Sequence, residues 1–343
     1  MRRREGRLSV LWTMVLALLP VAAALAALGI GRIQIPPADV VKSLLAKLSG
    51  SPGLEELSEK TLWQLRMPRI ILAALAGAGL SVAGCAFQSL FANPLATPDT
   101  LGVASGASFG AALGILLGFK MIGIQLTSLT MGASAVALTW LCGRGRGRGL
   151  STVVLSGIMI GSLFSALVSL VKFAADAESQ LPAITYWLMG GLDKANYKTL
   201  AYGAPPILLA IVVLWLMRWR MNLLPLSDDE ARSSGVHIGA LRTVTVICAT
   251  VMTASVVAMC GQVGWVGLLI PHMCRMKFGS DHRALIPASV CLGAAFMICV
   301  DTCAQEVLDI VDGVCEPVNE DACIGCAACV EECPMGAIEI DED

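Results

Sequence analysis

Charged and aromatic residues are both scarce in this chain of 343 residues. Charged side chains make up 15% of it and aromatic side chains 5%, whereas 56% of the residues are hydrophobic and the mean hydropathy is +0.74. Because soluble domains carry about 25% charged residues, this composition excludes an ordinary cytosolic globule. At about 20 apolar residues per spanning helix, the chain has room for roughly nine or ten spans.

Catalytic and nucleotide-binding patterns are also missing. Residues 1–304 have no G-x-x-x-x-G-K-[ST] loop, no catalytic triad and no zinc-ligand spacing. We therefore expect a chain that is not an enzyme and that uses ATP only through a partner. The GRGRGRG run at 143–149 is interpreted as a basic loop facing anionic membrane lipid, and no nucleic-acid partner is expected.

Basic residues stop before residue 301. Residues 1–300 hold all 24 Lys and Arg against 13 acidic residues, a net charge of +11. Residues 301–343 hold the other 13 acidic residues, a net charge of −13, and six of the 13 cysteines. This break predicts a transmembrane domain over residues 1–304 and an acidic, cysteine-rich tail over residues 305–343.

Nine apolar segments predict an all-α, multi-pass helix bundle of about nine spans. They lie at about 9–30, 68–90, 101–119, 121–142, 151–173, 200–217, 243–260, 262–274 and 284–300, and the segment 262–274 is short for a crossing. Arginine-rich gaps at the N-terminus, 144–148, 218–242 and 275–283 predict the cytoplasmic side. Nine crossings from an inner N-terminus place the tail outside, where disulfides are favoured over reduced thiolates. A working iron–sulfur cluster would require an even number of crossings.

Small residues recur every four positions inside several predicted spans, which lets helix backbones approach closely. The stripes include Gly102, Gly106, Gly110, Gly157, Gly161 and Ser165. Packing within the bundle is the simpler interpretation. The alternative is that one stripe lines a pathway between two subunits.

Four ordered blocks resemble the permeases of iron-chelate and cobalamin ABC importers, the FecCD family. The first, residues 64–114, includes Arg66, Pro68, Arg69, Gln88 and the run NPLATPDTLG at 93–102. The others are YWLMGGL at 186–192, MNLLPLSDDEARSSGV at 221–236 and GQVGWVGLLIPHMCRMKFGSDHRALIP at 261–287. The likeness extends over about residues 1–304 and then stops, and no apolar run long enough for the family's tenth span follows.

The resemblance implies a homodimeric permease in the inner cell membrane, served by an extracytoplasmic substrate-binding protein and two cytoplasmic ATPase subunits. In the family, arginines at the positions of Arg66 and Arg69 meet acidic residues of the binding protein. Arginine suits that task because its planar fork binds a carboxylate through two hydrogen bonds. The alternative is that both arginines extend to lipid headgroups.

The resemblance also implies two cytoplasmic loops that contact the ATPase. The alternative for each is a solvated connection. The first loop carries Asp228, Asp229, Glu230, Arg232 and Gly235. The second is expected over 271–283, with Pro271, His272, Arg275, Asp281, His282 and Arg283.

The tail carries Cys323, Cys326, Cys329, Cys333 and Pro334 in the pattern C-x2-C-x2-C-x3-C-P. This pattern resembles half of a bacterial two-cluster ferredoxin and predicts a four-iron cluster. In such ferredoxins the fourth cysteine of the run ligates the other cluster, so Cys315 or a second copy of the tail would have to complete the site. An unoccupied remnant and a zinc site are the alternatives.

The leading hypothesis is the membrane subunit of an ABC importer for a metal chelate, such as a ferric siderophore, haem or cobalamin. One alternative is a membrane-anchored electron-transfer protein whose tail reduces a bound ferric complex. Another is a non-functional chimera of a permease and a ferredoxin fragment.

Overall fold

The computed structural model describes residues 8–29, 35–49, 56–143, 150–192, 195–226, 230, 233–302, 308–311 and 314–317. The helical elements are α1 (Val10–Gly29), α2 (Pro37–Ser49), α3 (Glu56–Lys60), the π-helical turn η1 (Thr61–Arg66), α4 (Met67–Leu90), the 3-10 turn η2 (Pro98–Leu101), α5 (Val103–Leu116), α6 (Met121–Gly143), α7 (Leu150–Ala174), α8 (Gln180–Met189), α9 (Tyr197–Met217), the 3-10 turn η3 (Arg220–Leu223), α11 (Ile238–Cys260), α12 (Val266–Phe278) and α13 (His282–Thr302). Two strands follow, β1 (Leu308–Val311) and β2 (Val314–Pro317).

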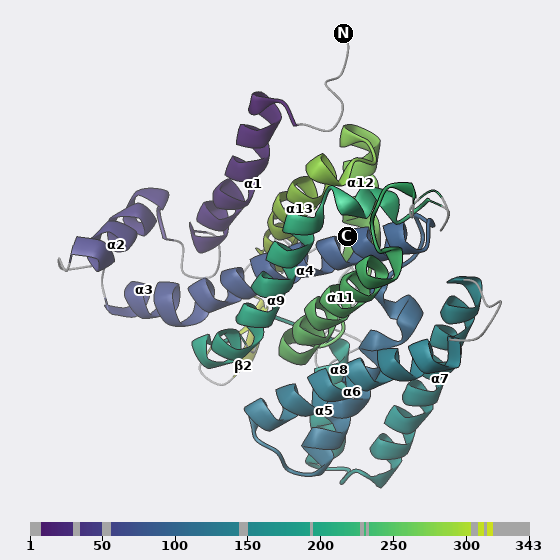
Figure 1. Cartoon of the computed structure of the whole chain (residues 1–343). Helices are drawn as coiled ribbons and strands as arrows, with labels where there is room; N and C mark the ends of the chain where they lie inside the picture. Colours follow the sequence, from purple (N-terminus) through teal and green to yellow (C-terminus); the bar gives the residue numbers. More distant parts are fainter. Residues whose placement is uncertain are drawn as a thin grey trace, which may run out of the picture.

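The all-α membrane bundle predicted from the sequence is confirmed (Figure 1). Each of the nine apolar segments contains a helix, and seven helices of the described residues are long and apolar enough to cross a membrane. The two shorter ones are α5 and α12, the second of which was expected to be short. The expected loop over 271–283 is wrong, because residues up to Phe278 belong to α12 and only Gly279–Asp281 connect α12 to α13.

Helix α4 is the centre of the bundle, and two glycine contacts fix its neighbours. A Cβ atom on Gly77 would lie 2.0 Å from the carbonyl O of Gly293 in α13. A Cβ atom on Gly84 would lie 1.7 Å from the carbonyl O of Gly267 in α12. The backbones are therefore close enough to exclude any side chain, which is how small residues allow helices to associate in lipid.

The predicted glycine stripes also pack inside the protomer. Gly106 and Gly110 face the backbone of α6, and a Cβ atom on Gly110 would lie 2.2 Å from the carbonyl O of Thr127. Gly157 of α7 lies against Thr100 in η2, and Gly161 lies near Gly102. These contacts agree with the simpler interpretation of the stripes.

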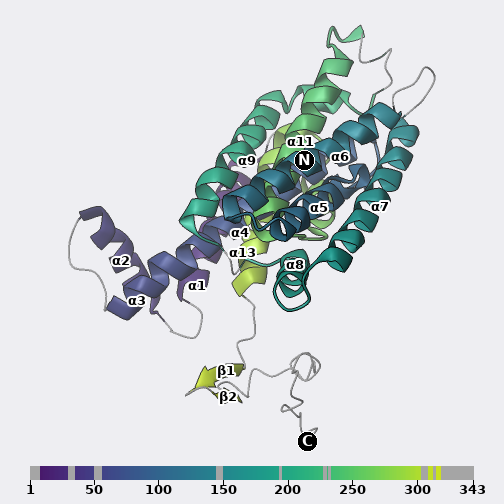
Figure 2. The same ribbon diagram turned by 90° about the horizontal axis from the view of Figure 1, so that it is seen from below.

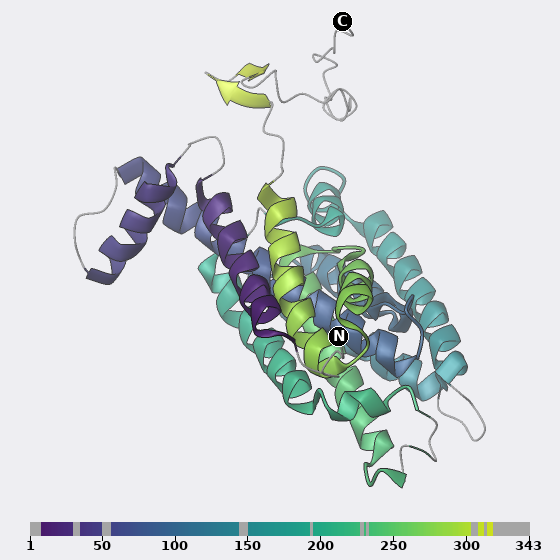
Figure 3. The same ribbon diagram turned by 90° about the horizontal axis from the view of Figure 1, so that it is seen from above.

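The two ends of the bundle carry different features. The segment between α9 and α11 lies at one end, and α2, α3 and the end of α13 lie at the other (Figures 2 and 3). The hairpin of β1 and β2 pairs Leu308 with Pro317 and follows α13 at that second end. The cysteines of the C-x2-C-x2-C-x3-C motif lie outside the described residues.

We expect Gly84→Val to destabilise the protein by about 2–4 kcal/mol, since the new side chain must push α4 and α12 apart. Thermal unfolding of the purified protein in detergent checks this. Gly239→Ala is the matched control, because a Cβ atom there meets nothing within 4 Å. Equal unfolding temperatures for the two variants would contradict the contact.

Candidate functional site: the inner coupling cluster and the outer arginines

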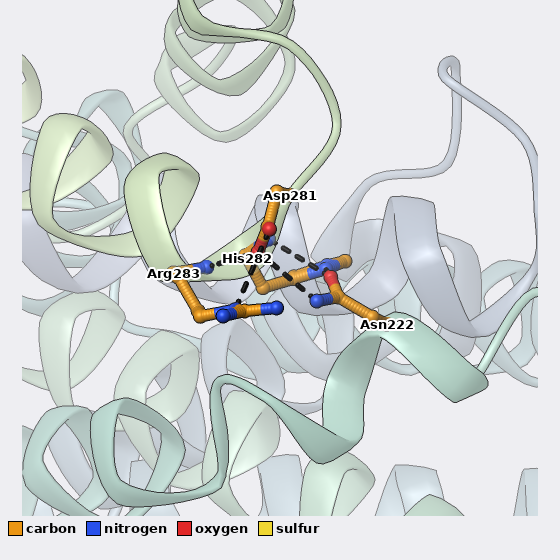
Figure 4. Close-up of polar contacts among 4 residues, drawn as sticks. All are labelled: Asn222, Asp281, His282 and Arg283. Carbon is orange, nitrogen blue, oxygen red and sulfur yellow. Dashed lines mark hydrogen bonds and ion pairs between the residues drawn. The ribbon is translucent and has the colours of Figure 1, made fainter. Parts of the chain in front are cut away.

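A polar cluster joins η3 to the start of α13 at the end of the bundle that carries the arginine-rich segments (Figure 4). The amide oxygen of Asn222 accepts hydrogen bonds from the backbone N–H of His282 at 2.9 Å and from its ring Nδ1 at 2.6 Å. The amide nitrogen of Asn222 donates to Asp281 at 3.0 Å. One side chain of η3 therefore holds the turn before α13 through three hydrogen bonds.

The buried His282 ring extends this connection to α4. Its Nε2 lies 2.5 Å from the hydroxyl of Ser89, and His282 is only 3% exposed. An amide oxygen can only accept, so Nδ1 carries a proton; in the neutral ring Nε2 then accepts from Ser89. The Ser89 hydroxyl also lies 2.8 Å from the carbonyl O of Cys85. Because Ser89 has a single proton, the ring nitrogen and that carbonyl share one donor.

Asp281 lies at the edge of the cluster that faces solvent. It accepts from the backbone N–H of Arg283 at 2.9 Å, and its other oxygen lies 3.4 Å from Arg283 Nε. Partial burial alone would raise the pKa of Asp281, but the hydrogen bonds from Arg283 and Asn222 and the Arg283 charge hold that pKa below its usual value. The carboxylate therefore stabilises the fold above the pKa of an ordinary aspartate, and this contribution is lost as the pH falls through the lowered pKa.

Gln88, next to Ser89, ties the same turn of α4 to α12. Pro271 has no backbone N–H, so the carbonyl O of Gly267 four residues earlier lacks its usual helical donor. The Gln88 amide nitrogen lies 3.4 Å from that oxygen and 3.3 Å from the carbonyl O of Leu268. The Gln88 amide oxygen accepts from Arg275. The last turn of α4 thus contacts both α12 and α13.

The predicted coupling residues divide into surface and interior positions. Glu230, Gly235, His272 and Arg283 are exposed, whereas Pro271 and His282 are buried and Arg275 is half-buried. A direct ATPase contact through His282 or Pro271 is wrong, because neither side chain reaches the surface. Asp228, Asp229 and Arg232 lie outside the described residues.

The two predicted docking arginines lie at the opposite end of the bundle. Arg66 ends the π-helical turn η1, and Arg69 lies in the first turn of α4, three residues along the same helix face. Arg66 Nη1 donates to the carbonyl O of Leu28 at the end of α1, at 2.7 Å. Both side chains are half-buried. Short π-helical turns often mark functional positions in helices.

Trp63 connects the π-helical turn η1 to its surroundings. Its indole N–H donates to Ser43 of α2 at 3.0 Å, and its carbonyl O accepts from the Tyr197 hydroxyl at 2.7 Å. The Lys47 ammonium lies 5.4 Å from the centre of the Trp63 ring. Contacts from α2 and α9 therefore hold the turn that carries Arg66.

Helix α7 has one face that no other described element covers. Leu155, Met159, Leu163 and Leu170 are 50–66% exposed along it. Ser165 is exposed on the same helix and donates to the carbonyl O of Gly161 at 2.9 Å. Hydroxyl groups bonded back to their own helix, between small residues, suit contact with another helix.

Asn222 and Ser89 are the residues of this cluster that sequence reasoning missed. Asn222 lies inside the block 221–236, one residue from its start, but the residues of this block predicted to contact the ATPase all lie between 228 and 235. No spacing in the sequence relates Ser89 to His282, which are nearly 200 residues apart. Among the described residues, no group of three or more His, Cys, Asp and Glu side chains could hold a metal.

We expect Asn222→Leu to destabilise the protein by about 2–4 kcal/mol, since it removes three hydrogen bonds and leaves the Nδ1 and N–H of His282 without an acceptor. Asn222→Asp should cost less, because its oxygens still accept from His282. Thr243→Val, an exposed change on α11, is the control. Thermal unfolding measures all three, and an effect of Asn222→Leu no larger than that of Thr243→Val would refute the role of the cluster.

Comparison with known proteins agrees with the family blocks and with the bundle. The profile of the FecCD transport family matches residues 18–314, and that of a 4Fe-4S binding domain matches residues 316–339. The chain is 37% identical to the molybdate import system permease protein MolB of Haemophilus influenzae, over 86% of this chain and 87% of that one. It is 32% identical to the hemin transport system permease protein HmuU of Yersinia pestis, over 77% and 85% of the two chains.

A solved structure described as an inward-facing conformation of a metal-chelate type ABC transporter superposes with a TM-score of 0.77. That structure is 35% identical in sequence and covers 86% of this chain and 90% of its own. The family consists of membrane subunits that transport and do not themselves catalyse. The chain therefore belongs to the FecCD transport family, as a multi-pass permease subunit of an ABC importer in the inner membrane.

Proposed function

We propose that this permease works as a homodimer that imports a metal chelate, such as a ferric siderophore, haem or cobalamin, with energy from two cytoplasmic ATPase subunits. The relatives' names support a metal-containing cargo, since they mention molybdate, hemin and Fe(3+)-citrate. The observation that carries the proposal is the cluster of Asn222, His282 and Ser89, which joins a charged cytoplasmic segment directly to two transmembrane helices, α13 and α4.

In this mechanism the exposed residues of the segment between α9 and α11, Glu230 and Gly235 among them, contact the ATPase. Closure of the ATPase moves η3, and Asn222 transmits that movement to α13 through His282. Ser89 and Gln88 transmit it to α4 and α12. His282 and Arg275 therefore act inside the permease, and Arg283 and His272 act at its surface.

The uncovered face of α7 forms the seam of the dimer and one wall of the transport path. Leu155, Met159, Leu163 and Leu170 are 50–66% exposed on that face. Ser165 lies at its edge, where its hydroxyl donates to Gly161 and lies 3.5 Å from the hydroxyl of Ser105 in α5. Contact with the second copy would bury the apolar side chains.

The rival electron-transfer function requires the tail to meet cytoplasmic electron donors. Helix α13 starts beside η3 and is long and apolar enough to cross a membrane, so it ends on the side opposite the segment between α9 and α11. The importer is therefore the function proposed for the whole chain.

The decisive experiment measures ATP-dependent uptake by proteoliposomes that contain the full chain and its ATPase partner. Labelled molybdate, haemin and ferric citrate serve as probes, each with a loaded binding protein. We expect accumulation of one probe. Asn222→Leu, which removes the acceptor for His282, should retain ATP hydrolysis while transport falls at least tenfold, and Asn222→Asp, which keeps an acceptor there, should transport better than Asn222→Leu. Uptake should survive the change of Cys323, Cys326, Cys329 and Cys333 to serine. An ATPase that does not co-purify with the permease would reject the proposal.

Charge reversal at the outer arginines tests docking separately. Each charge-assisted pair contributes about 1.5–3 kcal/mol, so Arg66→Glu or Arg69→Glu should weaken binding of the substrate-binding protein by about 10- to 100-fold. Surface plasmon resonance on the permease in nanodiscs measures this. Lys120→Glu, at the turn between α5 and α6, is the control and should change binding little. Unchanged affinity in both arginine variants would contradict their docking role.

A further inference from the structure

A non-helical segment, residues 261–265, joins α11 to α12 at membrane depth. Near its start, the Gln262 amide nitrogen donates to the Ser108 hydroxyl at 3.0 Å, and Ser108 lies about 12 Å along the helix from the outer end of α5. Just after its end, Gly267 lies against Gly84, about 9 Å from the inner end of α4. The chain therefore passes through the middle of the bundle here without helical structure.

The backbone of this segment is exposed and poor in hydrogen bonds. Gln262 and Gly264 are exposed, and Trp265 is 81% exposed. Trp265 also has a left-handed backbone conformation, with a φ of 66°, which residues other than glycine seldom adopt. Within the part of the chain that the structure describes, none of the four N–H groups from Gln262 to Trp265 donates to a backbone carbonyl.

Lipid cannot supply the missing hydrogen-bond partners of this backbone. Non-helical backbone at membrane depth therefore occurs only where protein buries it or where it lines a water-filled cavity. Because Gln262, Gly264 and Trp265 are exposed, water is the partner that fits this segment.

Polar side chains continue the exposed backbone toward α7. Ser108, which accepts from Gln262, lies three residues after Ser105 on one face of α5. The Ser105 hydroxyl lies 3.5 Å from that of Ser165 in α7. We call Ser165, Ser105, Ser108, Gln262 and the backbone of 263–265 the polar strip. It reaches the edge of the exposed face of α7 and contains no charged side chain.

The end of α8 holds the start of the segment in place. The N–H of Gly191 donates to the carbonyl O of Cys260 at 2.8 Å. A Cβ atom on Gly190 would lie 2.3 Å from the carbonyl O of Gln262. Helix α8 itself lies at the end of the bundle where α13 ends (Figure 2). These contacts fix the first half of the segment and leave Gly264 on its exposed side, where a Cβ atom would meet nothing within 4 Å.

We propose that the polar strip lines the water-filled part of the transport path, and that Gln262 and Trp265 contact the passing chelate there. This inference rests on the proposed import function. The N–H groups of the segment donate to oxygen atoms of the chelate, and the Trp265 ring packs against its organic part. Uncharged groups suit this task, because a cargo in transit must bind firmly enough to enter and weakly enough to leave.

Cysteine accessibility tests the water-filled path, with the full-length permease and its ATPase partner in proteoliposomes. Gly264→Cys adds a reporter without a steric clash. We expect a charged methanethiosulfonate reagent to modify it, since the reaction requires the thiolate, which forms in water and not in lipid. Peptide mass spectrometry distinguishes this label from the native cysteines. Leu209→Cys, at a position 65% exposed in the middle of α9, is the matched control and should react only with membrane-soluble N-ethylmaleimide.

Contact with the cargo is tested by protection and by uptake. Haemin, ferric citrate and molybdate are supplied in turn on a loaded binding protein with ATP. The probe that is taken up should slow modification of Gly264→Cys at least threefold relative to ATP alone. Gln262→Leu should lower uptake of that probe at least tenfold and more than Ser108→Ala does. Both changes remove the same hydrogen bond, but only the first removes a group that faces the path.

Each measurement has an outcome that contradicts one step. If Gly264→Cys reacts only with N-ethylmaleimide, or with neither reagent, while uptake persists, the segment does not line the path and the import function stands. Modification without protection, or equal losses in Gln262→Leu and Ser108→Ala, would refute the contact with the chelate. Absence of uptake of all three probes by the unaltered permease would reject the import function and this inference with it.

Discussion

Helices in lipid gain no hydrophobic free energy from one another, so this bundle depends on direct contact between backbones. Gly77 and Gly293 let α4 meet α13, and Gly84 and Gly267 let α4 meet α12. The two contacts fix the positions of α12 and α13 along the axis of α4. At these positions, Gln88 reaches Arg275 and Ser89 reaches His282. The polar cluster is thus a consequence of where glycine permits close packing.

Much of the fold could be predicted from the sequence, because burial in lipid imposes long apolar segments. The all-α bundle followed from hydropathy, and the arginine-rich gaps indicated one end. The family blocks predicted docking of the binding protein at Arg66 and Arg69, and contact with the ATPase near Arg275 and Asp281. Their positions at opposite ends of the bundle agree with that reading of the charges.

The remaining details depend on contacts between distant segments. Pro271 suggested a loop, yet α12 continues through it, since Gln88 supplies the donor that proline lacks. His282 looked like a surface residue in a run of charges, but it begins a buried helix face. Neither outcome has a local signal, because each requires a partner on α4. Asn222 was missed because its partners, Asp281 and His282, are about 60 residues away in the sequence.

The proline in α12 has a mechanical consequence. An ordinary helix loses an internal hydrogen bond when it bends, whereas α12 has already given up that bond at Pro271 and receives a replacement from a different helix. The half of α12 that follows Pro271, which carries Arg275, can therefore bend about Pro271 at little enthalpic cost. The Gln88 side chain contacts the Arg275 guanidinium through its amide oxygen and the carbonyl groups of Gly267 and Leu268 through its amide nitrogen, so it limits the angle of that bend.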